Sequence, residues 1–132
     1  MNKAIPPKIL TSLALLACLT GAAAHAAEEK TINDGVFTTE QVDAGESVYN
    51  NSCKSCHDKR FYRDALRAWK DQPLLYLWET VLGTMPADNP GSLLLDEYTN
   101  VIAFILSEQG FPAGETILDP DAGMDTIHIT AP

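Results

Sequence analysis

The sequence is poor in positive charge and in cysteine, and it has no apolar run long enough to cross a membrane. Nine lysines and arginines stand against eighteen aspartates and glutamates, a net charge of −9. A nucleic-acid partner is therefore not expected, because binding a phosphate backbone needs cations that displace counterions. Three cysteines are an odd number, which disfavours a disulfide framework. Eight glycines and eight prolines are too few for a collagen-like or low-complexity chain, so 132 residues suit one globular domain.

The first 26 residues are typical of an export signal. Lys3 and Lys8 give a positive start, and an uncharged, mostly apolar run follows from Ile9 to Leu19. That run is shorter than the ~20 apolar residues of a membrane span, so no transmembrane helix is expected. Small residues flank His25 and suit cleavage after Ala26. The sequence therefore predicts export to the periplasm.

An alternative for the same segment is a lipid anchor that faces the periplasm. Leu15-Leu16-Ala17-Cys18 resembles the lipobox of bacterial lipoproteins, in which the cysteine is acylated and becomes the new N-terminus. Leu16 fits its position poorly, and the apolar run continues past Cys18. Cleavage after Ala26 is the favoured interpretation.

The mature chain divides into three parts. Residues 27–37 are polar without periodicity and are expected to form a flexible lead-in. Residues 38–114 carry four apolar stripes at helical spacing and form the predicted domain. Residues 115–132 are acidic and turn-rich, which predicts an extended tail on the surface. No strand pair is expected, and the fold class is all-α with about four short helices.

Capping residues suggest where these helices begin and end. Thr38 and Gln41 form a capping box, and Gly45 inside the first helix should let another helix approach closely. A second stripe covers residues 59–69, after which Asp71 is expected to cap the third helix.

The later boundaries depend on glycines. Gly83 is expected to end the third helix. The fourth and clearest stripe starts at Leu94, and Gly110 is expected to end that helix in a left-handed conformation.

The most informative motif is C-x-x-C-H at residues 53–57, the signature of c-type haem attachment. At this spacing Cys53 and Cys56 can each form a thioether with one vinyl group, and His57 reaches the iron from the same side. The alternatives are a redox-active dithiol and half of a zinc site. A thioredoxin-type dithiol follows a strand, whereas a helix precedes this motif. Zinc needs four ligands, and outside the motif only His128 and carboxylates are available.

The sixth iron ligand has three candidates in the mature chain. Met85 lies in a polar loop between two helix patterns, with 27 residues between it and His57, and Pro86 stiffens that loop. A thioether so placed can reach the far face of the ring, so Met85 is the predicted distal ligand. Met124 and His128 lie in the tail and are the alternatives.

The mature chain resembles the class I cytochromes c of bacterial periplasms. In particular, it is similar to small cytochrome domains associated with pyrroloquinoline-quinone-dependent dehydrogenases. The matching stretches run from Asp34 to His57 and from Thr84 to Gly114. The resemblance implies a cytochrome c-like bundle around one covalently attached haem c, with thioethers at Cys53 and Cys56, proximal His57 and distal Met85.

The resemblance also makes a packing prediction and shows one departure. It implies that Gly45 and Tyr49 cross the last helix near Val101 and Phe104. Such cytochromes usually have a Gly- and Pro-containing loop after the motif, where a proline carbonyl holds the histidine ring. Residues 58–72 contain neither glycine nor proline, so the group that orients His57 is open.

Positive charge is concentrated in one part of the chain. Six of the nine basic residues fall within residues 54–70, and helical spacing puts Arg60, Arg63, Arg67 and Lys70 on one face. This face is interpreted as a solvated surface, as a contact to the haem propionates, or as a docking surface for an acidic partner.

The sequence thus predicts an electron carrier rather than an enzyme. Its expected partners are a dehydrogenase, such as a quinoprotein dehydrogenase, as donor and an oxidase or another cytochrome as acceptor. Two alternatives are a haem protein with an open or displaceable distal site, acting as a sensor or small peroxidase, and a cytochrome subunit of a larger dehydrogenase complex.

Overall fold

The structure, a computed structural model, describes residues 29–132. The predicted export signal and the alternative anchor at Cys18 lie outside these residues. The described chain forms α1 (Thr39–Ser52), α2 (Lys59–Ala68), α3 (Leu74–Thr84), α4 (Leu95–Glu108), the 3-10 turn η1 (Met124–Thr126), and two short strands, β1 (Lys30–Thr31) and β2 (Ile127–His128). The prediction of an all-α domain with four short helices is confirmed. Among residues 29–132, no helix combines the length and apolarity that a membrane span requires.

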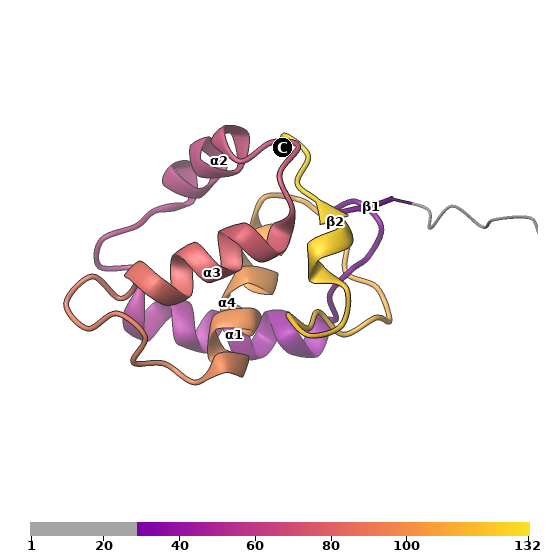
Figure 1. Ribbon diagram of the computed structural model, residues 1–132. Coiled ribbons are helices and arrows are strands. Elements are labelled where there is room, and N and C mark those ends of the chain that lie inside the picture. The colour runs from indigo at the N-terminus through magenta and orange to yellow at the C-terminus, as the bar shows by residue number, and fades with distance from the viewer. Residues whose placement is uncertain (1–28) are drawn as a thin grey trace, which may run out of the picture.

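α1 and α4 cross where α1 has a glycine (Figure 1). A Cβ built on Gly45 would collide with the carbonyl oxygen of Asn100 and would lie 2.9 Å from the Cβ of Phe104. One turn further on, the ring of Tyr49 lies 5.1 Å from that of Phe104, and both rings pack with Val101. The predicted crossing is confirmed, and only glycine allows the two backbones to approach this closely.

The starts of the helices agree only partly with prediction. The Thr38–Gln41 capping box is present, with both hydrogen bonds 3.3 Å long. The expectation that Asp71 caps α3 is wrong, since Pro73 is the N-cap and no side chain caps this helix. Asp71 has a φ of 66°, and its backbone N–H donates to the carbonyl oxygen of Ile129 at 2.8 Å. A contact with a distant segment therefore determines the conformation at this position.

The ends of the helices also differ in detail. Gly83 does not end α3, because the next turn continues and the N–H of Met85 still donates to the carbonyl oxygen of Val81 at 2.9 Å. Leu94 does not belong to the buried stripe of α4: it is the N-cap, and 67% of it is exposed. Gly110 ends α4 with a φ of 91°, as predicted.

The segments on either side of the helices form part of the core, which corrects two expectations. β1 pairs in parallel with β2, although no strand pair was expected. The lead-in and the tail contribute side chains that are each at most 7% exposed: Ile32, Val36, Phe37, Leu118, Met124, Ile127 and Ile129. These residues are neither a flexible lead-in nor a surface tail. Strands of two residues are too short to show an alternating pattern, and the apolar residues of the tail have no helical period.

The tail is held at two places far apart in the sequence. The side-chain amide of Gln41 in α1 both donates to and accepts from the backbone of Leu118, each at 2.8 Å. At its other end, Ile129 exchanges backbone hydrogen bonds with Asp71 and Gln72, between α2 and α3. Figure 1 shows the C-terminal segment beside the start of α3. The tail therefore links the first helix to the α2–α3 junction.

This architecture predicts that the tail contributes to global stability. Ile129→Ala removes a fully buried side chain and should lower the free energy of unfolding by about 2–4 kcal/mol. Ile117→Ala is the matched control, since Ile117 is 67% exposed and its truncation should change stability by ~0.5 kcal/mol or less. Urea unfolding of the exported protein measures both values. An equal loss of unfolding free energy in Ile129→Ala and Ile117→Ala would contradict the packing of the tail described here.

Candidate haem site

A cavity of about 720 Å³ lies among the helices and the loop that joins α3 to α4. Its volume lies within the range of roughly 300–1,000 Å³ that small-molecule and cofactor sites usually have. The apolar lining comes from α2, α3, the loop and α4, and it includes Leu66, Trp69, Leu77, Val81, Leu93 and Ile102. The buried faces of the helices thus converge on a space that suits a flat apolar ligand.

The C-x-x-C-H residues line the cavity at the end of α1. Cys53 is the C-cap of α1, and the N–H groups of Cys56 and His57 donate to its carbonyl oxygen at 3.1 and 3.0 Å. This tight turn brings both thiols and the imidazole to the cavity. Cys53 is half-buried and Cys56 is exposed, and neither forms a disulfide. Burial raises the pKa of the Cys53 thiol, and its hydrogen bond with Tyr62 acts in the opposite direction.

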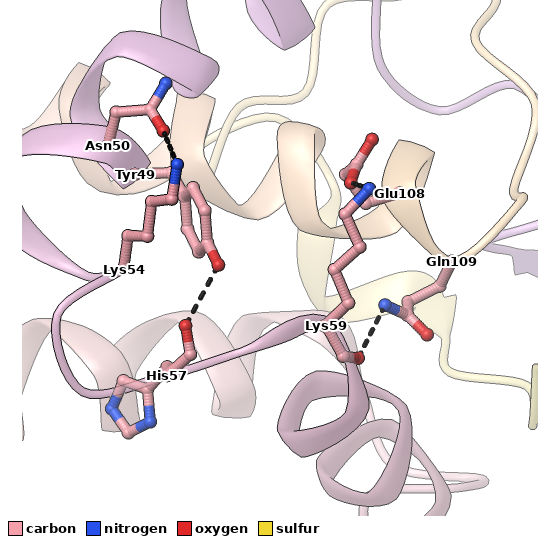
Figure 2. A network of polar contacts seen from close by, with 7 residues as sticks. All are labelled: Tyr49, Asn50, Lys54, His57, Lys59, Glu108 and Gln109. Atoms are coloured by element: carbon pink, nitrogen blue, oxygen red, sulfur yellow. Dashed lines mark hydrogen bonds and ion pairs between the residues drawn. The ribbon is translucent and has the colours of Figure 1, made fainter.

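His57 is held by aromatic residues. The hydroxyl of Tyr49 donates to the backbone carbonyl oxygen of His57 at 2.9 Å (Figure 2). The imidazole ring stacks on Phe61, with ring centroids 4.2 Å apart, and lies 5.7 Å from the ring of Tyr62. Tyr62 is itself half-buried, and burial together with the nearby Cys53 raises the pKa of its phenol. In this chain aromatic packing therefore surrounds the histidine where the related cytochromes have a proline loop.

The segment that carries the motif is also fixed where α2 begins. The amide of Gln109 donates to the carbonyl oxygen of Lys59 at 3.0 Å, and the ammonium of Lys59 pairs with Glu108. Figure 2 shows these contacts to the right of His57 and the Tyr49 contact above it. The end of α4 thus positions the start of α2, while α1 positions the motif itself.

Met85 lines the same cavity from the loop that follows α3. It is the C-cap of α3 and is half-buried. Its carbonyl oxygen accepts from the hydroxyl of Tyr98 at 2.7 Å and from the N–H of Gly91 at 3.3 Å. The backbone of Met85 is therefore tied both to α4 and to its own loop.

The two alternative distal residues lie elsewhere. Met124 is fully buried in the main core and does not line the cavity. His128 lies in β2, with its Nδ1 3.4 Å from the carbonyl oxygen of Asp71, and it does not line the cavity either. Of the three candidates, the structure brings only Met85 together with the C-x-x-C-H residues.

The basic residues of α2 and of the turn after it lie outside the cavity. Arg60, Arg63, Arg67 and Lys70 are exposed, and none of them lines it. Arg63 and Arg67 lie 3.8 and 3.6 Å from a carboxylate oxygen of Asp64, in exposed pairs that contribute little to stability. The four residues therefore form a charged outer surface beside the haem motif.

The side chains at the cavity fit a haem c. Two thiols, an imidazole and a thioether face a mainly apolar space. Soft thioether and imidazole ligands are those that c-type cytochromes offer to iron, and thiols are the groups that attach haem covalently. This donor set and this fold together define a class I c-type cytochrome.

Comparison with known families agrees with this class. The family model described as "Cytochrome C oxidase, cbb3-type, subunit III" matches residues 40–105, which is half of the chain and runs from α1 into α4. The chain belongs to this family of c-type cytochrome domains. It is accordingly a haem-binding electron-transfer protein. Neither the curated proteins nor the solved structures gave a match.

Several residues of the site were not predicted from the sequence. Phe61 and Tyr62 fall within the second predicted stripe, residues 59–69, and no role at the site was predicted for them. No sequence pattern indicated the contact of Tyr98 with the loop, because it depends on the path that the loop takes. None indicated the contact of Gln109 with α2 either, because it joins segments far apart in the sequence. The one indication in the sequence was that Tyr98 lies on the apolar stripe of the fourth helix, because a tyrosine hydroxyl that becomes buried needs a hydrogen-bond partner.

Proposed function

We propose that this chain is a periplasmic mono-haem cytochrome that carries single electrons between a dehydrogenase and an oxidase or another cytochrome. The observation that carries the proposal is that the C-x-x-C-H residues and Met85, from different parts of the fold, line one apolar cavity. In this proposal Cys53 and Cys56 form the thioethers, and His57 and Met85 are the axial ligands. When bound, haem c supplies an iron that changes between the ferric and ferrous states.

The protein's own tasks are to hold the ligands and to exclude water. The turn after α1 holds the thiols and the imidazole, and the loop after α3 holds the thioether. The apolar lining lowers the local dielectric, which is one of the factors that set a reduction potential. We propose no catalytic residue, since the role requires no acid–base group.

The location and partners of the protein rest on the sequence. The predicted export signal supports the periplasm, as c-type cytochromes are typically exported. The resemblance to cytochrome domains associated with quinoprotein dehydrogenases supports such an enzyme as donor. The family's description, which names an oxidase subunit, supports an oxidase as acceptor.

A second candidate function is that of a subunit in a larger dehydrogenase complex. Leu94 and Leu95 are 67% and 61% exposed at the start of α4, next to the loop that carries Met85. Two neighbouring exposed leucines favour a protein contact at this place. Size-exclusion chromatography of the native extract distinguishes a free carrier from a subunit. The sensor or peroxidase alternative is less well supported, because it leaves Met85 without a role at the cavity.

Covalent attachment predicts the effect of removing a thiol. Cys53→Ala or Cys56→Ala should leave little folded holoprotein, because the haem would contribute much of the buried apolar area of a small domain. The yield of exported protein and its helical circular dichroism measure this effect. A normal yield of a helical, haem-free variant would contradict the prediction.

The distal assignment predicts the reduction potential of a Met85 variant. Met85→His should lower the potential by on the order of 0.1 V and keep the iron six-coordinate, since imidazole donates more strongly than a thioether and favours ferric iron. Potentiometric titration measures the shift. Met124→Leu is the control: it conserves volume in the core and should leave both the potential and the weak long-wavelength band of ferric iron–thioether ligation in place. Loss of that band in Met124→Leu would show that the assignment is wrong.

We further propose that the exposed bases of α2 steer acidic partners toward the haem edge. Oxidation by the anion hexacyanoferrate(III) should be roughly two- to tenfold slower in Arg63→Gln/Arg67→Gln at low salt. The difference should shrink as salt rises, because charges are screened beyond ~10 Å at 0.1 M. Lys30→Gln, which removes one exposed charge from β1, should change the rate little. Equal rates for all three proteins at every salt concentration would favour a merely solvated surface.

A further inference from the structure

The loop that carries Met85 is tied at both ends to one phenol. The hydroxyl of Tyr98, in the first turns of α4, donates to the carbonyl oxygen of Met85 at 2.7 Å. The hydroxyl oxygen of Tyr98 in turn accepts from the N–H of Leu93 at 3.4 Å. Met85 and Leu93 lie at or near the two ends of the loop, and both line the cavity. A single side chain therefore spans the base of the loop.

Tyr98 is well placed to act as a rigid anchor. Its side chain is fully buried in the main core, and its backbone lies within α4. Tyr98 does not line the cavity itself, so any effect on a bound ligand would have to pass through the loop. Two further bonds lie within the loop: Asn89 donates to the Pro86 carbonyl oxygen at 2.9 Å and Gly91 to that of Met85 at 3.3 Å. The N–H of Met85 continues the hydrogen bonding of α3, so the Tyr98 bond is the one that joins its carbonyl oxygen to α4.

We propose that Tyr98 is the positioning residue for the distal ligand. By fixing the Met85 backbone to α4, it holds the thioether at the iron against competing ligands. The inference rests on the proposed function, in which Met85 is that ligand. A thioether is a weak donor, so its occupancy depends on how well the protein holds it in place. A partly buried carbonyl oxygen that loses its shorter hydrogen bond favours conformations in which the loop has moved away.

The test is competition with imidazole in the ferric holoprotein. Tyr98→Phe keeps the ring in the core and removes the hydroxyl. Added imidazole should then displace Met85 at roughly tenfold lower concentration than in the unmodified protein, because a lost hydrogen bond of this kind corresponds to about a tenfold change in an equilibrium. The weak long-wavelength band of iron–thioether ligation reports the displacement.

Thr99→Val is the matched control. Thr99 is the next residue of α4, and its buried hydroxyl accepts from Trp78 Nε1 at 3.0 Å without touching the loop. This substitution also removes a buried hydroxyl from the same helix turn, so it should loosen the fold without changing the imidazole affinity. The inference would be overturned if Tyr98→Phe and the unmodified protein bound imidazole with equal affinity. It would also be overturned if the imidazole affinity rose equally in Tyr98→Phe and Thr99→Val.

Met85→Leu separates this inference from the proposed function. If the long-wavelength band survives in Met85→Leu, the distal assignment itself is wrong. If the band is lost there while Tyr98→Phe binds imidazole like the unmodified protein, only the role of Tyr98 is wrong. Should Tyr98→Phe give no holoprotein, hydrogen exchange of the unmodified protein supplies the test. The Leu93 amide should then be protected by its bond to Tyr98, and rapid exchange would contradict the inference.

Discussion

The close approach of α1 and α4 at Gly45 is the contact on which the geometry of the site depends. It places the end of α1, and with it residues 53–57, against the middle of α4. α4 in turn reaches three parts of the site: it packs on Tyr49, ties the start of α2 through Gln109, and holds the Met85 loop through Tyr98. The His57 side and the Met85 side of the cavity are therefore positioned by the same helix. A change in the crossing would move both.

The local parts of this arrangement were predictable from the sequence. C-x-x-C-H is a contiguous motif. The capping box and the helix end at Gly110 depend only on residues a few positions away in the sequence. The four helices followed from apolar periodicity. Met85 could be preferred over Met124 because it lies in a polar loop between two helix patterns, whereas Met124 lies in the tail. The structure brings Met85 to the cavity.

The parts that escaped prediction depend on distant contacts. Asp71 looks like a helix cap, but its backbone pairs with Ile129, nearly sixty residues later. The tail is acidic and mostly polar, yet four irregularly spaced apolar side chains are buried and anchor it in the core. Leu94 fits the period of α4 but lies at its exposed end. Spacing shows which residues can share a face, whereas burial depends on what the rest of the chain places against that face.

The central claim is that one haem is fixed to Cys53 and Cys56 in this cavity. The most direct measurement is mass spectrometry of the exported protein after denaturation, followed by peptide mapping. The account predicts a polypeptide that carries the mass of one haem, with the added mass on the peptide containing residues 53–56. A polypeptide without added mass, with both of these thiols free to react with an alkylating reagent, would contradict it.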